Sequence, residues 1–265
     1  MPAAVKLQKE FGDDIQVIFV ESQNSGFGKS VGMATKSGWL GNQAIWTNNY
    51  LFSSPGRGLP AFALLDGEGK VVISGSSNSM HGQIVDNIER MIKEKGEGPE
   101  GVPSNVAKVY TDLGKGSYAK AAARAEKVLA KPGSKDTASV VAAAEASLAA
   151  VNARLDGELS RGEWLVANGF PLRAKELADG LVKSTKGNAD MSDKATAFQT
   201  KLTGGDYAAE FSAAKNLAKL EKALYEDGGS DKLVKKLQEL SVDASGTAVA
   251  KRAEALVDIA KYAQL

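Results

Sequence analysis

The sequence predicts an α+β chain, with a mixed α/β module first and an all-α domain of helical hairpins after it. Apolar runs with the length of strands occur at 15–20, 61–65 and 71–73. A stretch rich in glycine and proline follows at 96–103 and cannot continue a helix. Beyond it, alanine, leucine, lysine and glutamate fill windows of helical length. These three observations separate the two parts of the chain.

The module is predicted to begin with a helix and a strand. Apolar residues recur at helical spacing from Ala4 to Phe11, and Gly12 ends the pattern. The run 15–20 then alternates in the manner of a strand. Because Gln16 alone interrupts its apolar character, we expect both faces of this strand to be covered.

A β-hairpin and a second helix complete the module. The runs 61–65 and 71–73 flank the sequence DGEG at 66–69, and an Asp-Gly pair readily supplies the positive φ of a tight turn. Apolar residues from Ile84 to Ile92 then lie on one side of an amphipathic helix that ends near Lys95.

We place the domain boundary in the glycine and proline stretch. The module then covers 1–95, the linker 96–103 and the helical domain 104–265. Within the domain, glycine and proline mark the ends of helices at 114–116, 132–133, 169–171, 187–188, 204–205 and 228–229.

Helices rich in small residues start after Gly116, Gly205 and Gly246. Such starts resemble those of tetratricopeptide-type helices, in which alanines let neighbouring helices approach closely. Their spacing is not a fixed period, so we expect an array of helical hairpins rather than a regular repeat.

Composition restricts the classes of function. The sequence contains no cysteine and a single histidine, so no metal site or other cofactor is predicted. A net charge of +1 gives no general attraction to nucleic acid, and no apolar run is long enough to span a membrane. The N-terminus lacks the pattern of a signal peptide, so the sequence assigns no compartment.

The stretch 23–30, QNSGFGKS, resembles the end of a Walker phosphate-binding loop. Gly28, Lys29 and Ser30 fit that pattern, but Gln23 stands where the first glycine is required. We therefore expect a polar loop that enters a helix rather than a phosphate site.

The stretch 58–72, GLPAFALLDGEGKVV, resembles the thioredoxin-like family. In that family a cis-proline precedes a strand, a turn of Asp-Gly-x-Gly type follows, and the paired strand leads to a final glycine and the last helix. The resemblance places Pro60 at the cis-proline, Gly75 at the final glycine and 81–95 at the last helix. It covers residues 1–95 and implies a partial thioredoxin-like α/β module.

The chain departs from the family at the redox site. The Cys-x-x-Cys motif of a thiol-disulfide oxidoreductase, with its strand and helix, belongs upstream of Pro2, and the sequence holds no thiol. The strands available are those near 15–20, 61–65 and 70–74, which predicts a sheet of three strands.

Three functional hypotheses remain open. The chain is a non-catalytic binding or scaffold module, or a truncated oxidoreductase that is extracytoplasmic if a signal segment lies upstream, or a helical interaction array. No catalytic residue is predicted for the sequence as given. Each binding hypothesis implies a protein or peptide partner.

The resemblance implies a peptide groove beside Leu59 and Pro60, and Trp39 and Trp46 are further candidates for its lining. The alternative for the tryptophans is that they cap a core while their indole N–H groups bind carbonyls. Trp164 and Phe170, in the helical domain, are expected to anchor helix packing. His81 is expected to be solvated near a helix N-terminus, without a catalytic role.

Overall fold

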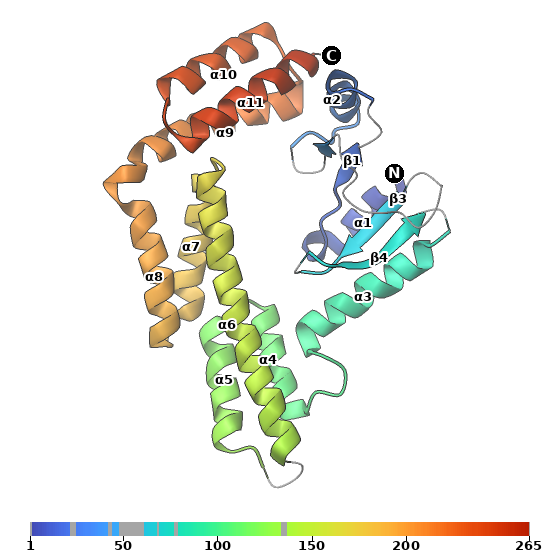
Figure 1. Cartoon of the computed structure of the whole chain (residues 1–265), viewed down its shortest axis with the longest axis vertical. Helices are drawn as coiled ribbons and strands as arrows, with labels where there is room; N and C mark the ends of the chain where they lie inside the picture. The colour runs from blue at the N-terminus through green and yellow to red at the C-terminus, as the bar shows by residue number, and fades with distance from the viewer. Residues whose placement is uncertain are drawn as a thin grey trace. The chain divides into compact units, whose positions relative to one another are not determined.

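The computed structural model describes residues 2–21, 25–41, 44–47, 61–67, 69–76, 79–133 and 137–264. The chain divides into two compact units. We call Met1–Lys93, with Tyr225–Gly228 and Tyr262–Leu265, the mixed unit; Glu94–Leu224 and Gly229–Lys261 form the helical unit. Figure 1 labels helices α1 to α11 and strands β1, β3 and β4.

The mixed unit contains short strands between helices. Its elements in chain order are α1 (Pro2–Phe11), the 3-10 turn η1 (Gly12–Asp14), β1 (Phe19–Glu21), α2 (Phe27–Lys36), β2 (Ala44–Trp46), β3 (Ala61–Leu65), β4 (Val71–Ser76) and α3 (His81–Glu97). The helices predicted before Gly12 and from about residue 81 to 95 are thus confirmed.

The four strands form two separate sheets. β1 pairs with β2 in parallel, with Phe19 opposite Ala44, whereas β3 pairs with β4 antiparallel. Over the described ranges no strand pairing joins the two sheets. The predicted three-stranded sheet and partial thioredoxin-like α/β module are therefore wrong, because the described chain is mostly helical and carries two small two-stranded sheets.

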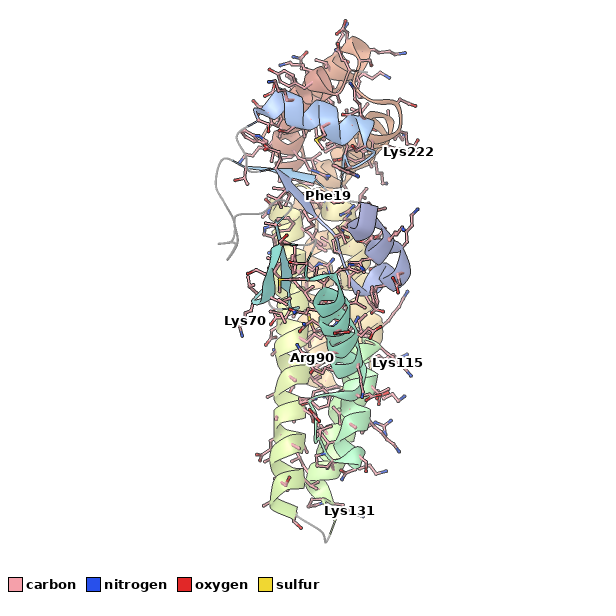
Figure 2. The ribbon with its side chains drawn as sticks, turned by 90° about the vertical axis from the view of Figure 1, so that its right-hand side faces the viewer. Phe19, Lys70, Arg90, Lys115, Lys131 and Lys222 are labelled. Atoms are coloured by element: carbon pink, nitrogen blue, oxygen red, sulfur yellow. The ribbon has the colours of Figure 1, made fainter. Side chains whose placement is uncertain are left out.

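The first predicted strand is shorter than expected because a side chain forms hydrogen bonds with backbone groups in its first part. Gln8 of α1 donates from Nε2 to the Ile15 carbonyl at 2.9 Å and accepts from the Val17 amide at 2.6 Å. These backbone groups are therefore held by a side chain rather than by a neighbouring strand. Strand pairing begins only at Phe19, which Figure 2 labels.

The expectation that both faces of this strand are covered is also wrong. Ile18 and Val20 are 47% and 40% exposed, and Ile45, the partner of Val20 in β2, is 44% exposed. One face of the small sheet is thus apolar and open to solvent.

The hairpin is confirmed, but its turn differs from the expectation. Asp66 donates its amide to the Lys70 carbonyl at 2.9 Å and accepts from the Lys70 amide through Oδ1 at 2.9 Å. Gly69, rather than the glycine directly after the aspartate, has the positive φ, at 80°. The apolar faces of α1 and α3 pack near this hairpin in a core of Leu7, Ile84 and Ile88, with Phe11, Ile15, Phe62 and Leu64 against it.

The helical unit is built from consecutive helices joined by short loops, and the breaks predicted from glycine and proline are confirmed. Its helices are α4 (Ser104–Gly114), α5 (Tyr118–Ala130), α6 (Thr137–Ala167), α7 (Pro171–Thr185), α8 (Ala189–Thr203), α9 (Ala208–Asp227), α10 (Asp231–Asp243) and α11 (Ala248–Tyr262). Figure 2 labels Lys115, directly after the end of α4, and Lys131, directly after the end of α5.

Small residues let α4 to α8 pack closely. α5 packs on α4 and α6, and α7 packs on α6 and α8. Residues at these contacts that are fully buried include Ala121, Ala122, Ala125, Ala144 and Ala195. At the α6–α8 contact the Phe198 ring fills the space where a Cβ of Gly162 would stand. Among the helices described, none has the length and apolarity needed to cross a membrane.

Candidate interaction surface

The structure describes two of the four residues predicted to line a groove. Leu59 and Pro60 lie outside the described residues. In the mixed unit, Trp39 stacks on Phe19 with ring centroids 4.3 Å apart, and Trp46 meets Phe27 edge to face at 5.3 Å. Each tryptophan therefore has its own aromatic partner, and no ring contact joins the two tryptophans in the described part of the unit.

The Trp46 indole departs from the expected pattern of a core tryptophan. Its Nε1 atom is buried and finds no acceptor among the described residues. A buried donor left in this way costs about 1 to 3 kcal/mol. The expectation that both indole N–H groups bind carbonyls is thus wrong for Trp46 in the described structure.

A second aromatic group lies in the helical unit and is exposed. Trp164, three residues before the end of α6, is 57% exposed, so its predicted role as a packing anchor is wrong. Its ring stacks with that of Phe170 at a centroid distance of 6.1 Å and an interplanar angle of 17°. Phe170 itself is partly buried against the core around Leu165 and Phe198, as expected.

Two arginines complete this group, which we call the Trp164 cluster: Trp164, Phe170, Arg173 and Arg252. The guanidinium carbon of Arg252, on α11, lies 3.4 Å from the centroid of the Phe170 ring. That of Arg173, on α7, lies 5.4 Å from the same centroid. Both distances are those of cation–π contacts.

Arg252 is fixed by polar contacts on two sides. Its Nη1 donates to the Gly169 carbonyl at 3.3 Å, and its Nη2 forms an ion pair with Glu221 of α9. The side chains of Arg252 and Glu221 are 21% and 12% exposed, so the pair is largely shielded from water. This arginine therefore holds the Phe170 ring against α11.

The loop before Phe170 requires glycine. Gly169 has a φ of 77°, and a Cβ at this position would lie 2.8 Å from the Ala248 carbonyl oxygen. Both the backbone conformation and the close approach of α11 exclude a larger residue without strain.

A carboxylate fixes the start of α11. Glu210, in the first turn of α9, accepts from the Ala248 amide at 2.7 Å and from the Val249 amide at 3.3 Å. Amides at a helix N-terminus have no partner inside the helix, and an anionic side chain satisfies them well. Thr247 Oγ1 accepts from the Ala250 amide at 3.0 Å, so the start of α11 is already capped by protein groups.

The acidic residues beside Trp164 already have partners. Glu163 accepts from Lys201 of α8 at 2.6 and 2.8 Å, a hydrogen bond that raises the pKa of the lysine. Glu158 lies 3.4 Å from Arg161, whose side chain is 66% exposed. Both of these carboxylates are therefore paired with cations.

Sequence reasoning missed most of this site. The sequence GFP at 169–171 predicts a helix break, and the sequence predicts packing roles for Trp164 and Phe170. Nothing in the local pattern indicated Arg252 or Glu221, because they reach Phe170 from helices far along the chain. Within the described chain, no cluster of three or more histidine, aspartate or glutamate side chains could hold a metal ion.

Comparison of the chain with family models, with curated proteins and with solved structures gave no match. The comparisons thus give the thioredoxin-like resemblance no support.

Proposed function

We propose that this chain is a non-catalytic binding protein whose helical unit acts as an interaction array for a protein partner. The observation that carries the proposal is the Trp164 ring, 57% exposed on a rigid support. Tryptophan and arginine are the side chains that most often dominate the energy of protein interfaces.

The energetics of the exposed ring support a docking role. The uncovered part of a tryptophan exposed to this degree amounts to roughly 100 Å². Covering it with an apolar partner group would contribute about 2 to 3 kcal/mol. The ring is also held in place before binding, since Phe170 stacks on it and Arg252 fixes Phe170. A partner would therefore lose little free energy in ordering this surface.

The helical arrangement supports the same role. Arrays of helices joined by short loops present extended surfaces for partners, and their stability comes from contacts between neighbouring helices. The redox alternative would need cysteines, which the sequence given does not contain.

Panning a random peptide display library on the immobilised full-length chain tests the proposal. Selected peptides are then measured against Trp164→Ala and against Val242→Ala, a control that truncates another exposed apolar side chain of the same unit, 72% exposed. We expect binding to fall at least about tenfold in the tryptophan variant only. Peptides that bind both variants and the parent chain equally would overturn the proposal, because they would show that the Trp164 ring is not the docking site.

A further inference from the structure

We propose that the segment docking on the Trp164 cluster is an acidic peptide that carries a central aromatic side chain. The inference rests on the proposed binding function and specifies the partner.

An arginine stands near each of the two rings. Arg161 stands one helical turn before Trp164, on the same face of α6. Arg173 of α7 is exposed and contacts the Phe170 ring. A bound peptide that covers both rings would therefore have guanidinium groups nearby.

Two carboxylates near the cluster are already engaged: Glu163 is held by Lys201, and Glu221 by Arg252. Glu176 is exposed one helical turn after Arg173 on α7. Glu158 contacts Arg161 at 3.4 Å, at a distance and exposure where an ion pair contributes little. Arg173 has no ion pair with any described residue, so its charge is available to a partner carboxylate.

The pattern of charge favours a peptide over a nucleic acid. Recognition of a phosphate backbone uses several lysines or arginines along one surface and is driven by the release of counterions. Here the cations stand near a single aromatic stack, and the whole chain has a net charge of +1. A guanidinium beside an aromatic ring matches one carboxylate next to one apolar side chain.

The test uses the full-length chain labelled with 5-fluorotryptophan. The sequence has three tryptophans, so the fluorine spectrum is expected to contain three tryptophan signals, and Trp164→Phe identifies the one from the cluster. The probe is a ten-residue peptide of glutamates around a central phenylalanine. Two control peptides carry lysines in place of the glutamates, or alanine in place of the phenylalanine, and a ten-nucleotide single strand is the nucleic-acid control.

We expect the acidic phenylalanine peptide to move the Trp164 signal and to bind at least about tenfold more tightly than each control. Arg173→Glu should weaken its binding by a similar factor. Lys232→Glu, which makes the same charge change at an exposed site on α10, should leave binding unchanged. Arg173→Lys should retain most of the affinity, which excludes a general loss of structure.

The inference is overturned if the lysine peptide or the oligonucleotide binds as tightly, if the signals of Trp39 or Trp46 move instead, or if Arg173→Glu has no effect. The display experiment separates this failure from that of the proposed function. Selected peptides that need Trp164 but lack acidic residues would refute the partner chemistry alone.

Discussion

Replacing Asp112 by asparagine should destabilise the helical unit at neutral pH. The residue is 4% exposed and lies in the last turn of α4. Its Oδ2 accepts from Arg124 Nε at 2.7 Å and its Oδ1 contacts Lys120 Nζ at 3.0 Å, both on α5. The substitution keeps the shape of the side chain but leaves both cations without their carboxylate.

The expected loss in the free energy of unfolding is about 2 to 3 kcal/mol. Breaking a buried ion pair by removing one charge costs about 3 to 5 kcal/mol. The loss here should be smaller, because the side chains of Arg124 and Lys120 are 34% and 65% exposed and keep part of their hydration. Arg124, the less exposed cation with the shorter contact, should account for most of the effect.

The loss should depend on pH in a defined direction. Burial on its own raises the pKa of Asp112, but the hydrogen bonds and charges of Arg124 and Lys120 outweigh it and hold the pKa below the ordinary value. A carboxyl whose folded pKa is lowered stabilises the fold above its unfolded pKa of about 3.9. That contribution disappears as the pH falls through the folded pKa, so parent and variant should converge in acid.

Urea unfolding followed by far-ultraviolet circular dichroism, from pH 7 down to pH 2.5, measures the difference. Asp156→Asn is the matched control, since its ion pair with Lys194 at 2.8 Å has side chains 50% and 55% exposed. An exposed pair of this kind contributes less than about 1 kcal/mol. If both variants lost the same stability at pH 7, or if the effect of Asp112→Asn were undiminished in acid, the reasoning would be refuted.

Three further substitutions test packing and capping in the same unit. In α6, Gly162→Ala should destabilise the unit by about 1 to 2 kcal/mol, since overpacking against Phe198 exceeds the gain in helix propensity. Gly157→Ala, with open space around it, should stabilise the unit by about 0.5 to 1 kcal/mol. The two variants should therefore shift the midpoint of urea unfolding in opposite directions. Glu210→Ala should cost about 1 to 2 kcal/mol by removing the cap of α11, and faster amide hydrogen exchange in the first turn of α11 should accompany it. Exchange unchanged there would refute the capping role.

The sequence by itself determined where helices begin and end and where the hairpin turns. Pro171 starts α7 and the hairpin at 61–76 turns after Asp66 because these are local effects of proline geometry, polar turn residues and apolar periodicity. The helices predicted in both parts of the chain follow from apolar residues that recur at helical spacing. The boundary at 96–103 stays a prediction; the first long segment of the mixed unit ends at Lys93, and the helical unit begins at Glu94.

Tertiary structure decided which strands pair and where the candidate surface lies. Gln8 holds the backbone at Ile15 and Val17, which a strand pattern in residues 15–20 cannot reveal. Arg252 binds the Gly169 carbonyl from 83 residues away and fixes the Phe170 ring. The exposure of a side chain depends on the helices that pack around it, and those contacts arise only when distant segments fold together.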